Sequence, residues 1–403
     1  MAAPFYVHVA GALGIIMLGV WLHLFFGRGW YWRVRKFDFD GGRTEGEELS
    51  AWPRVVAVVP ARNEAETIGR EVSSLAQQKY PGEFSVVVVD DHSEDGTGAI
   101  ARKAAEELGA DKQARVVSAA ALPEGWTGKV WALNQGVASA LGGGGGAGER
   151  PDYYWFSDAD VVHTPDALRR LVGRAERDKL DLASLMVLLQ AKTLPERALI
   201  PAFLYSFLML YPPPWIADER ARTAGAAGGC ILLRRDALER IGGFGAIRGE
   251  VIDDCALARA VKRSGGRIWM GLTRKSVSLR SYGTFGEIRD LIARTAFTQL
   301  RYSALLLIGT LAGMLITYLM PVALLFVANL SARILGLTAW LVMTASFLPT
   351  VRFYGLSSLW APLLPLTSLF YSYATWVSAV RYWFGRGGLW KGRAQARRDV
   401  PTG

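Results

Sequence analysis

Four groups of acidic residues constrain the fold of this chain most, because each stands where an apolar run ends or a helix begins. Three groups follow the runs VVAVVPARN, FSVVVV and YYWFS, and the last precedes a helical segment. In order they are Glu64, the pair Asp90 and Asp91, the triplet Asp158-Ala159-Asp160, and the pair Asp253 and Asp254. A parallel sheet brings the carboxyl ends of its strands to one edge, so these acids can converge there.

Carboxylates that converge in this way need a cation nearby. Two like charges ~4 Å apart repel by roughly 4 kcal/mol at an effective dielectric constant near 20. A divalent metal or a raised pKa must relieve that repulsion. The sequence therefore predicts a cation site at the edge of a sheet.

The region between residues 54 and 302 alternates between strand and helix patterns. Strands are predicted at 55–60, 84–90, 115–118 and 153–157. Helices are predicted at 98–108, at 130–141 and from Pro165 onward, with Asn63 and Glu66 capping a helix after the first strand. Residues 142–146 are expected to form a flexible glycine loop. This alternation predicts an α/β domain with an open, mostly parallel sheet.

Both ends of the chain are apolar enough to enter a membrane. Residues 5–26 form one nearly uncharged run, and most of 303–384 is apolar. A membrane span needs about 20 helical residues. We predict an uncleaved N-terminal anchor and two to three C-terminal spans, from the candidates 304–329, 335–351 and 359–384. The middle candidate is short enough to be re-entrant, which leaves the number of crossings open.

Basic residues set the expected orientation. Arg28, Arg33, Arg35 and Lys36 follow the first apolar run, and positive charge beside a span marks the cytoplasmic side. The predicted plan is an anchor with its basic flank at 1–36, a linker at 37–53, a cytoplasmic α/β domain at 54–302, transmembrane helices at 303–384 and a basic tail at 385–403. The net charge of +10 is then explained by these flanks and by anionic lipid, so no nucleic-acid partner is expected.

The segment 194–217 is apolar and aromatic but is interrupted by Pro201 and by three prolines at 212–214. We predict an element that lies on the membrane surface, with a buried core helix as the alternative. Cys230 and Cys255, in a domain expected to be cytosolic, indicate neither a disulfide framework nor a zinc site.

Residues 54–302 resemble the membrane-bound family-two glycosyltransferases, inverting enzymes with the nucleotide-diphospho-sugar-binding GT-A fold. The motifs VVPARNE, VVVDDHSEDGT, DAD, GGCILLRR and IDD occur in the order of that family. Within it, LPEGWTGKVWALNQG and the flanking spans look most like the hopanoid-associated glycosyltransferases, and ceramide glucosyltransferases are looser relatives. The resemblance implies a bacterial-type inner (plasma) membrane, a nucleotide diphosphate sugar donor with UDP favoured, and a hopanoid or ceramide-like lipid acceptor.

The triplet Asp158-Ala159-Asp160 resembles the metal motif of this family. Two carboxylates in a strand-end turn can reach one cation that also holds the diphosphate, and hard oxygen ligands suit Mg²⁺ or Mn²⁺. Such a triplet alone usually forms a solvated turn, but its place after a strand and behind two matching motifs favours the metal role.

The resemblance places the nucleoside at the ends of the first two strands. It implies that Glu64 and Asp91 face the ribose and uracil and that Ala61 supplies backbone contacts, with Pro60 and Asp90 beside them. The alternative is that the polar residues cap helices and turns. Lys129, in a glycine-rich turn, can meet a diphosphate or sugar oxygen, and the alternative there is a solvated surface lysine.

Asp254 takes the position of the family's general base. An inverting transfer needs one carboxylate that accepts the proton of the acceptor hydroxyl. Asp253 stands where the family usually has Glu, and the alternative for both acids is complementation of a helix dipole.

Two further sites rest on weaker matches. Gly229, in the segment 228–230, resembles the lining of the acceptor and sugar pocket, or else allows close strand packing. Arg301 resembles the arginine of a Gln-x-x-Arg-Trp motif, but Thr298 and Tyr302 replace the glutamine and tryptophan. It can neutralise the leaving diphosphate, or it is a basic residue at a membrane interface.

Two other functions are compatible with these motifs. A processive polysaccharide synthase shares the site, but it should have more spans and an intact Gln-x-x-Arg-Trp. A catalytically silent membrane scaffold or sugar-nucleotide sensor is the second alternative.

Overall fold

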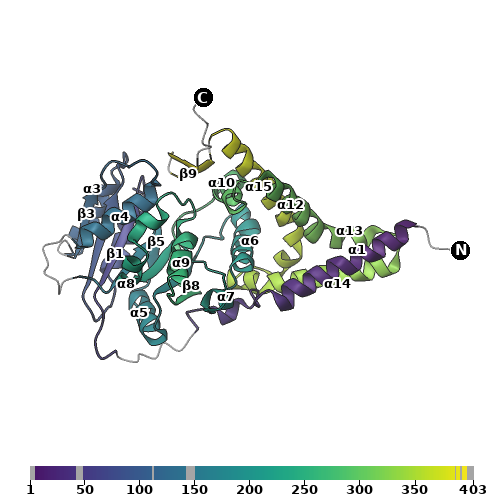
Figure 1. Cartoon of the computed structure of the whole chain (residues 1–403), viewed down its shortest axis with the longest axis horizontal. Helices are drawn as coiled ribbons and strands as arrows, with labels where there is room; N and C mark the ends of the chain where they lie inside the picture. The colour runs from purple at the N-terminus through teal and green to yellow at the C-terminus, as the bar shows by residue number, and fades with distance from the viewer. Residues whose placement is uncertain are drawn as a thin grey trace.

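The computed structural model describes residues 5–41, 49–110, 113–141, 150–385, 387–390 and 393–396. The predicted glycine loop, part of the predicted linker and much of the basic tail lie outside these residues. An α/β domain is joined to a group of long helices that extend away from it (Figure 1).

An eight-stranded sheet forms the centre of the α/β domain, in the order β3-β2-β1-β4-β7-β6-β8-β5. Four neighbouring pairs are parallel and three, all involving β7 or β5, are antiparallel. The strands are β1 (Val55–Ala61), β2 (Phe84–Asp90), β3 (Ala114–Ser118), β4 (Tyr153–Ser157), β5 (Val161–His163), β6 (Leu182–Leu188), β7 (Cys230–Arg234) and β8 (Ile268–Ser278). The prediction of a mostly parallel α/β sheet is confirmed.

Helices cover both faces of the sheet, so its central strands are buried on both sides (Figure 1). Along β1, Val56 and Val58 face a core shared with α4, while Val55 and Val59 face a core shared with α2 and α5. This burial explains why β1 is a continuous apolar run. The helices of this domain are α2 (Ile68–Ala76), α3 (Thr97–Glu107), α4 (Gly128–Leu141), α5 (Ala167–Asp178), α8 (Arg235–Arg240) and α9 (Asp253–Arg263).

Two predicted helix starts are wrong. Asn63 does not cap a helix, because α2 begins at Ile68; its backbone has a φ of 51° and its amide donates to Ser93 Oγ at 3.0 Å. The first strand therefore ends in a tight turn that is held to the next strand's loop. The helix after Pro165 begins two residues later, at Ala167.

The start of the predicted linker is attached to the sheet. Phe39 donates its backbone N–H to the carbonyl oxygen of Leu272 in β8, and Leu272 donates to the carbonyl oxygen of Phe37, both at 2.8 Å. The chain that follows the N-terminal helix is thus held against β8 through residues 37–39.

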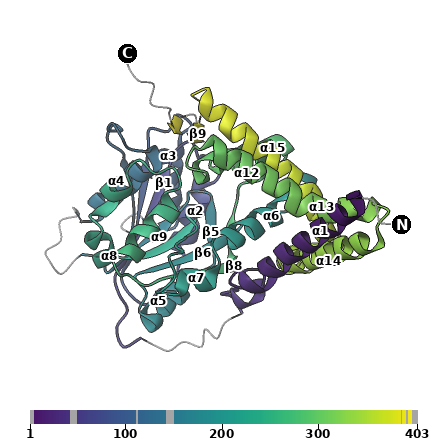
Figure 2. The same ribbon diagram turned by 45° about the vertical axis from the view of Figure 1, so that its right-hand side comes forward.

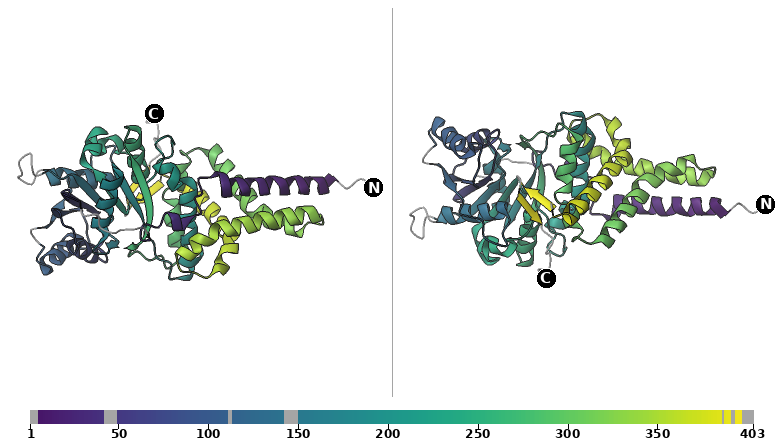
Figure 3. Two further views of the ribbon diagram at one scale, coloured as in Figure 1. Left: turned by 90° about the horizontal axis from the view of Figure 1, so that it is seen from below. Right: turned by 90° about the horizontal axis from the view of Figure 1, so that it is seen from above.

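Within the part of the chain that the structure describes, four helical segments are long and apolar enough to cross a membrane: Val9–Gly27, Leu194–Ala217, Ala304–Phe326 and Leu330–Phe353. They include α1 (Phe5–Leu22), α12 (Ala304–Met314), α13 (Met320–Ala323) and α14 (Leu330–Phe353). Two of the three predicted C-terminal candidates therefore qualify, whereas α15 (Leu364–Trp383), in the third, is a helix without that hydropathy. Helices α1 and α14 lie side by side and point away from the sheet (Figures 1 and 3).

Helices α6 (Leu194–Leu210) and α7 (Pro213–Ala217) lie between the sheet and the long helices (Figures 1 and 2). Pro201 lies inside α6 without ending it, so the segment is less broken than its prolines indicate. The hydroxyl of Tyr205 in α6 lies 2.7 Å from the hydroxyl of Ser346 in α14. Helices α10 (Phe285–Ala293) and α11 (Ala296–Gln299) lead from β8 to α12, and the short strands β9 (Gly387–Trp390) and β10 (Arg393–Ala396) follow α15.

Candidate active site

A pocket at the carboxyl edge of the sheet brings together residues from several elements. Pro60 closes β1, Asp158 follows β4, and Gly228 precedes β7. Ser157 of β4, Lys129 of α4 and the two acids at the start of α9 also belong to its polar lining. The apolar part consists of Leu133, Phe156, Ile231, Phe244, Ile247 and Leu257. The predicted convergence of residues 158, 253 and 254 is therefore present in the structure.

Lys129 lies between two of these acids. Its Nζ is 2.7 Å from Asp158 Oδ1 and 3.7 Å from Asp253 Oδ2. Burial alone would lower the pKa of Lys129, but the charges of the two aspartates outweigh burial and raise it. Lys129 is thus a permanent cation inside the pocket rather than a solvated surface residue.

Asp254 lies at the start of α9 and accepts hydrogen bonds from two backbone amides. Oδ2 accepts a hydrogen bond from the amide of Gly228 at 2.9 Å, and Oδ1 accepts from that of Cys255 at 2.7 Å. Burial and the neighbouring Asp253 raise the pKa of Asp254 to about 6, against the opposing effect of Lys129. A carboxylate with this pKa is ionised at neutral pH and still basic enough to accept a proton.

Gly228 lies close to both Lys129 and Asp254, so that a side chain at this position would crowd them. A Cβ at this position would lie 3.1 Å from Lys129 Nζ and 3.4 Å from Asp254 Oδ2. By contrast, the space beside Gly229 is filled by Val187 and Val161. Gly228 therefore lines the pocket. Gly229 instead packs closely against neighbouring strand residues, which is the alternative given for it above.

Arg280 joins the remaining acids of this edge. Its Nη2 lies 2.8 Å from Glu64 Oε1, and its Nε lies 3.3 Å from Asp160 Oδ2. Sequence reasoning missed Arg280, which lies in a polar loop two residues after the end of β8, a strand that was not predicted. The pKa of Asp160 is raised by burial and by Asp158, whereas Lys129 lowers that of Asp158 against the effect of burial.

The ends of β1 and β2 are also joined to each other. Arg62 Nη1 lies 2.5 Å from the carbonyl oxygen of Asp91, whose side chain is buried. Asp90 Oδ1 accepts a hydrogen bond from the amide of Ser93, and the amide of Glu64 donates to Thr97 Oγ1. These contacts show the expected turn and capping roles, which are compatible with a nucleoside lying on the same edge.

Not every predicted site residue reaches the pocket. Asp91 is not among the described residues that line it. Arg301 is also outside that lining; it is exposed and its backbone has a φ of 52°. A site role for Arg301 stays a prediction without a contact to support it.

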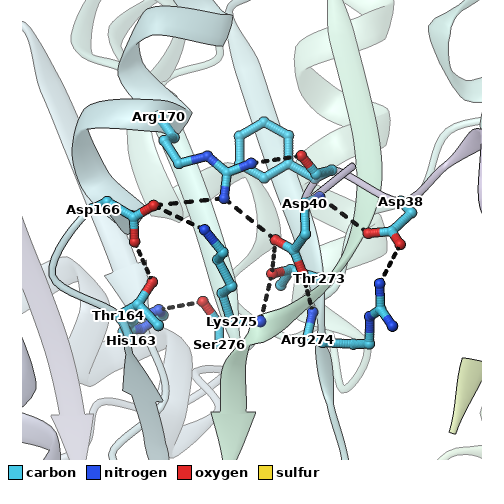
Figure 4. Close-up of polar contacts among 11 residues, drawn as sticks. Asp38, Asp40, His163, Thr164, Asp166, Arg170, Thr273, Arg274, Lys275 and Ser276 are labelled. Atoms are coloured by element: carbon cyan, nitrogen blue, oxygen red, sulfur yellow. Dashed lines mark hydrogen bonds and ion pairs between the residues drawn. The ribbon is translucent and has the colours of Figure 1, made fainter. Parts of the chain in front are cut away.

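A second group of residues, which were not predicted from the sequence, supports the turn that carries Asp158 and Asp160. Ser157 Oγ lies 2.9 Å from His163 Nε2, and His163 Nδ1 lies 2.8 Å from Ser276 Oγ (Figure 4). Burial lowers the pKa of His163 to about 3, so the ring is neutral. Glu71 of α2 is fully buried nearby, and burial raises its pKa well above the ordinary value.

The donor set fits a hard divalent cation. Among the described residues no group of three or more His, Cys, Asp or Glu side chains could hold a metal alone. Asp158 and Asp160 flank one turn, and each is paired with a cationic side chain, Lys129 and Arg280 respectively. Two carboxylates of this kind fit Mg²⁺ or Mn²⁺ when phosphate and water oxygens supply the other ligands.

Comparison with known proteins finds similarity to glycosyltransferases. The part of the β-monoglucosyldiacylglycerol synthase of Synechocystis sp. that aligns is 35% identical over 122 residues, 30% of this chain and 22% of that protein. The probable glycosyltransferase YdaM of Bacillus subtilis is 26% identical over 251 residues, 61% of this chain and 54% of its own. The chain therefore spans about a fifth and about half of the length of these relatives.

Among solved structures, the mannosyltransferase PcManGT from Pyrobaculum calidifontis, in complex with GDP-mannose and Mn²⁺, has a similar fold. The TM-score is 0.55 at 18% identity, and the match covers 92% of this chain and 99% of that one. Residues 56–242 match the model of the family described as Glycosyl transferase family 2. The similarity to that family thus covers residues 56–242, and the fold is GT-A-like.

Proposed function

We propose that this chain is an inverting, metal-dependent glycosyltransferase that transfers a sugar from a nucleotide diphosphate sugar to a hydroxyl of a membrane lipid. The observation that carries the proposal is the shared pocket of Asp158 and Asp254, with Lys129 beside both. The pocket thus combines groups that can hold an anionic donor with a carboxylate that can act as a base.

Each polar group has a role in this proposal. A metal held by Asp158 and Asp160, when bound, would stabilise the departing diphosphate. Lys129 is a buried cation that can pair with a phosphate oxygen in place of Asp158. Asp254 accepts the proton of the acceptor hydroxyl, a contribution of typically 10²–10⁴-fold. Its two backbone hydrogen bonds fix the direction from which it acts.

The proposed donor is UDP-linked, with Glu64, Asp91 and Ala61 beside the nucleoside. The similar structure from Pyrobaculum holds GDP-mannose. The experiment therefore has to vary both the nucleobase and the sugar of the donor. Arg280 is added to this side of the site, because it pairs with both Glu64 and Asp160.

The proposed acceptor is a lipid because of the elements that lead to the pocket. Tyr211 follows α6, and its hydroxyl lies 3.0 Å from Gln299 Oε1 just before the apolar helix α12. The aromatic ring of Tyr211 also packs against Gly225, three residues before the pocket residue Gly228. The name of the Synechocystis relative indicates a glycolipid product, and a hopanoid or ceramide-like acceptor is a narrower version of the same proposal.

The proposal includes a bacterial-type inner membrane with the α/β domain on the cytoplasmic side. It is supported by the four apolar helices and by the basic residues after α1. Helices α6 and α7, between the sheet and these helices, would then lie at the membrane surface (Figure 1).

The test is transfer of label by the full chain, purified and reconstituted in lipid nanodiscs with a total bacterial lipid extract. A panel of radiolabelled UDP- and GDP-sugars is supplied with Mg²⁺ or Mn²⁺. We expect label in one organic-soluble lipid, abolished by chelation, with an anomeric configuration opposite to that of the donor. Label in a long water-soluble polymer would support a processive synthase instead. Donor binding without turnover would support a silent sensor.

A further inference from the structure

Glu196, near the start of α6, is completely buried and is not part of the lining of the active-site pocket. Its Oε2 accepts hydrogen bonds from the backbone amides of Lys192 and Thr193, at 2.8 and 2.9 Å. The contact with Thr193 belongs to a capping box, in which the amide of Glu196 donates in turn to Thr193 Oγ1. The capping of α6 thus uses one of the two carboxylate oxygens.

The second oxygen of Glu196 holds a segment that is distant in the sequence. Oε1 accepts hydrogen bonds from the hydroxyl of Ser281 at 2.9 Å and from the backbone amide of Tyr282 at 2.6 Å. Thr193 Oγ1 also donates to the carbonyl oxygen of Tyr282, at 3.1 Å. Helix capping does not need these three contacts. The start of α6 therefore fixes the end of the loop that follows β8.

The start of the same loop is fixed by the turn that carries Asp160. Leu279 donates its backbone amide to the carbonyl oxygen of Asp160 at 2.6 Å, and Ser278 Oγ donates to Asp160 Oδ2 at 3.2 Å. These contacts continue the pairing of β5 with β8. Arg280 therefore lies between two ends of the loop that are anchored separately, one at Asp160 and the other at Glu196.

Arg280 joins two acids of the proposed donor site. Its Nη2 lies 2.8 Å from Glu64 Oε1, and its Nε lies 3.3 Å from Asp160 Oδ2. A guanidinium group is planar, so two carboxylates that pair with different nitrogen atoms of it are held in a fixed direction relative to each other. That direction depends on where the backbone of Arg280 lies, and the two anchors of the loop determine this position.

The rest of α6 is bonded to the helices that extend away from the α/β domain. Tyr205 pairs with Ser346 of α14, with their hydroxyl oxygens 2.7 Å apart. The hydroxyl of Tyr371 in α15 donates to the carbonyl oxygen of Leu199 in α6, at 2.9 Å. The helix that anchors the loop is thus itself held by α14 and α15.

We propose that Glu196 is a positioning residue for the metal and nucleotide site and that it acts through Arg280. By holding the end of the loop, its carboxylate keeps Arg280 where it pairs with Glu64 and Asp160. Glu196 itself contacts neither the donor nor the metal. The inference rests on the proposed function, which assigns Asp160 to the metal and Glu64 to the nucleoside.

The first measurement is amide hydrogen exchange of the full chain in a non-ionic detergent, without nucleotide. Glu196→Gln replaces one acceptor oxygen with an amide nitrogen, which donates and cannot accept. We expect the amides of residues 279–282 to exchange about tenfold faster than in the native chain. Glu287→Gln is the matched control, because Glu287 closes an equivalent capping box at the start of α10 but is exposed. Unchanged exchange in Glu196→Gln, or equally fast exchange in Glu287→Gln, would overturn the inference.

The second measurement is the affinity for UDP and for GDP in the presence of Mn²⁺, by isothermal titration calorimetry. It compares the native chain, Glu196→Gln, Arg280→Gln and the double variant. We expect Glu196→Gln to weaken binding of the preferred nucleotide about tenfold when Arg280 is present and to have no further effect in Arg280→Gln. A loss of the same size in both backgrounds would overturn the inference, because Glu196 would then act on the fold in general and not through Arg280.

A milder variant, Ser281→Ala, replaces Glu196→Gln in this cycle if the unfolding midpoint shows that Glu196→Gln does not fold. It removes one of the four hydrogen bonds to the carboxylate, from an exposed residue. We expect a smaller loss of nucleotide affinity that again disappears in Arg280→Gln, and no loss, or a loss that persists there, would overturn the inference. If the native chain binds neither nucleotide, the proposed donor is wrong and the donor role of Arg280 is wrong with it. Hydrogen exchange still decides separately whether Glu196 holds the loop.

Discussion

Lys262, near the end of α9, donates a hydrogen bond to the backbone carbonyl oxygen of Trp215 in helix α7, at 3.0 Å. The same ammonium group donates to the carbonyl oxygens of Ile216 and Thr223, both at 2.8 Å. Because α9 begins with Asp253 and Asp254, this contact joins the helix that carries the proposed base to the helix that lies next to the long apolar helices.

Replacement of Lys262 by Met should therefore destabilise the protein. It leaves three backbone carbonyls without their shared donor, and an unsatisfied buried group costs about 1–3 kcal/mol. The measurement is the free energy of unfolding in detergent. Arg263→Gln, a change of the next residue in the same helix, should have little effect. An unchanged stability of Lys262→Met would show that the carbonyls find water instead.

Replacement of Lys129 by Met should reduce sugar transfer. The pocket loses the ammonium group that lies 2.7 Å from Asp158 Oδ1. Removal of one charged group that stabilises a developing charge typically costs ~10²–10³-fold in kcat. Since Lys129 lowers the pKa of Asp254, the acidic limb of the pH–rate profile should also move to higher pH. Lys103→Met on α3 is the control. A native rate and an unshifted profile would remove Lys129 from the mechanism.

The rate of transfer should follow the ionisation of Asp254. With a pKa of about 6, this base is mostly ionised above neutral pH and is progressively protonated below about pH 6. We expect log(kcat/KM) to fall with a slope near one below that value and to be level just above it. The profile is measured with the stability of the protein checked at each pH. A level rate down to about pH 4 would contradict Asp254 as the base.

Replacement of Glu71 by Gln should stabilise the protein at high pH. Burial raises the pKa of Glu71, so the folded state holds this proton more tightly than the unfolded state. The stability that the proton contributes is complete below the ordinary pKa of about 4.3 and is lost as the pH rises toward the raised value. Glu71→Gln removes that loss.

The unfolding midpoints of Glu71→Gln and of the native chain are compared at about pH 5 and at about pH 8. The advantage of Glu71→Gln should be larger at the higher pH, whereas Glu66→Gln, at an exposed position of the preceding loop, should show no such trend. An equal effect at both values would mean that Glu71 is ionised in the folded protein.

The sequence allowed the first half of the sheet to be predicted because its strands are buried on both faces. Residues 55–59 and 86–89 are uninterrupted apolar runs, and the observed β1 and β2 include them. Strand β8 was not predicted, since Thr273, Arg274 and Lys275 interrupt its apolar pattern. These residues are accommodated because Asp40, which lies far away in the sequence, accepts from Thr273 Oγ1 and from the amide of Arg274 (Figure 4).

The site residues that follow predicted strands could be predicted, whereas those whose positions depend on the pairing of other strands were missed. Asp158 and Asp254 were expected to converge, and they line one pocket. Arg280 and His163 were missed because their positions depend on how β8 and β5 pair, which no local pattern specifies. Arg301 was included on a motif match alone, and its backbone turns at a φ of 52° outside the pocket.

The central claim is that Asp254 is the base of a sugar transfer to lipid. The most direct test compares the initial rate of the full chain in nanodiscs with that of Asp254→Asn, at saturating donor and metal. The account predicts a rate lower by roughly 10²–10⁴-fold, with donor affinity and unfolding midpoint close to native. Transfer by Asp254→Asn at the native rate would contradict it.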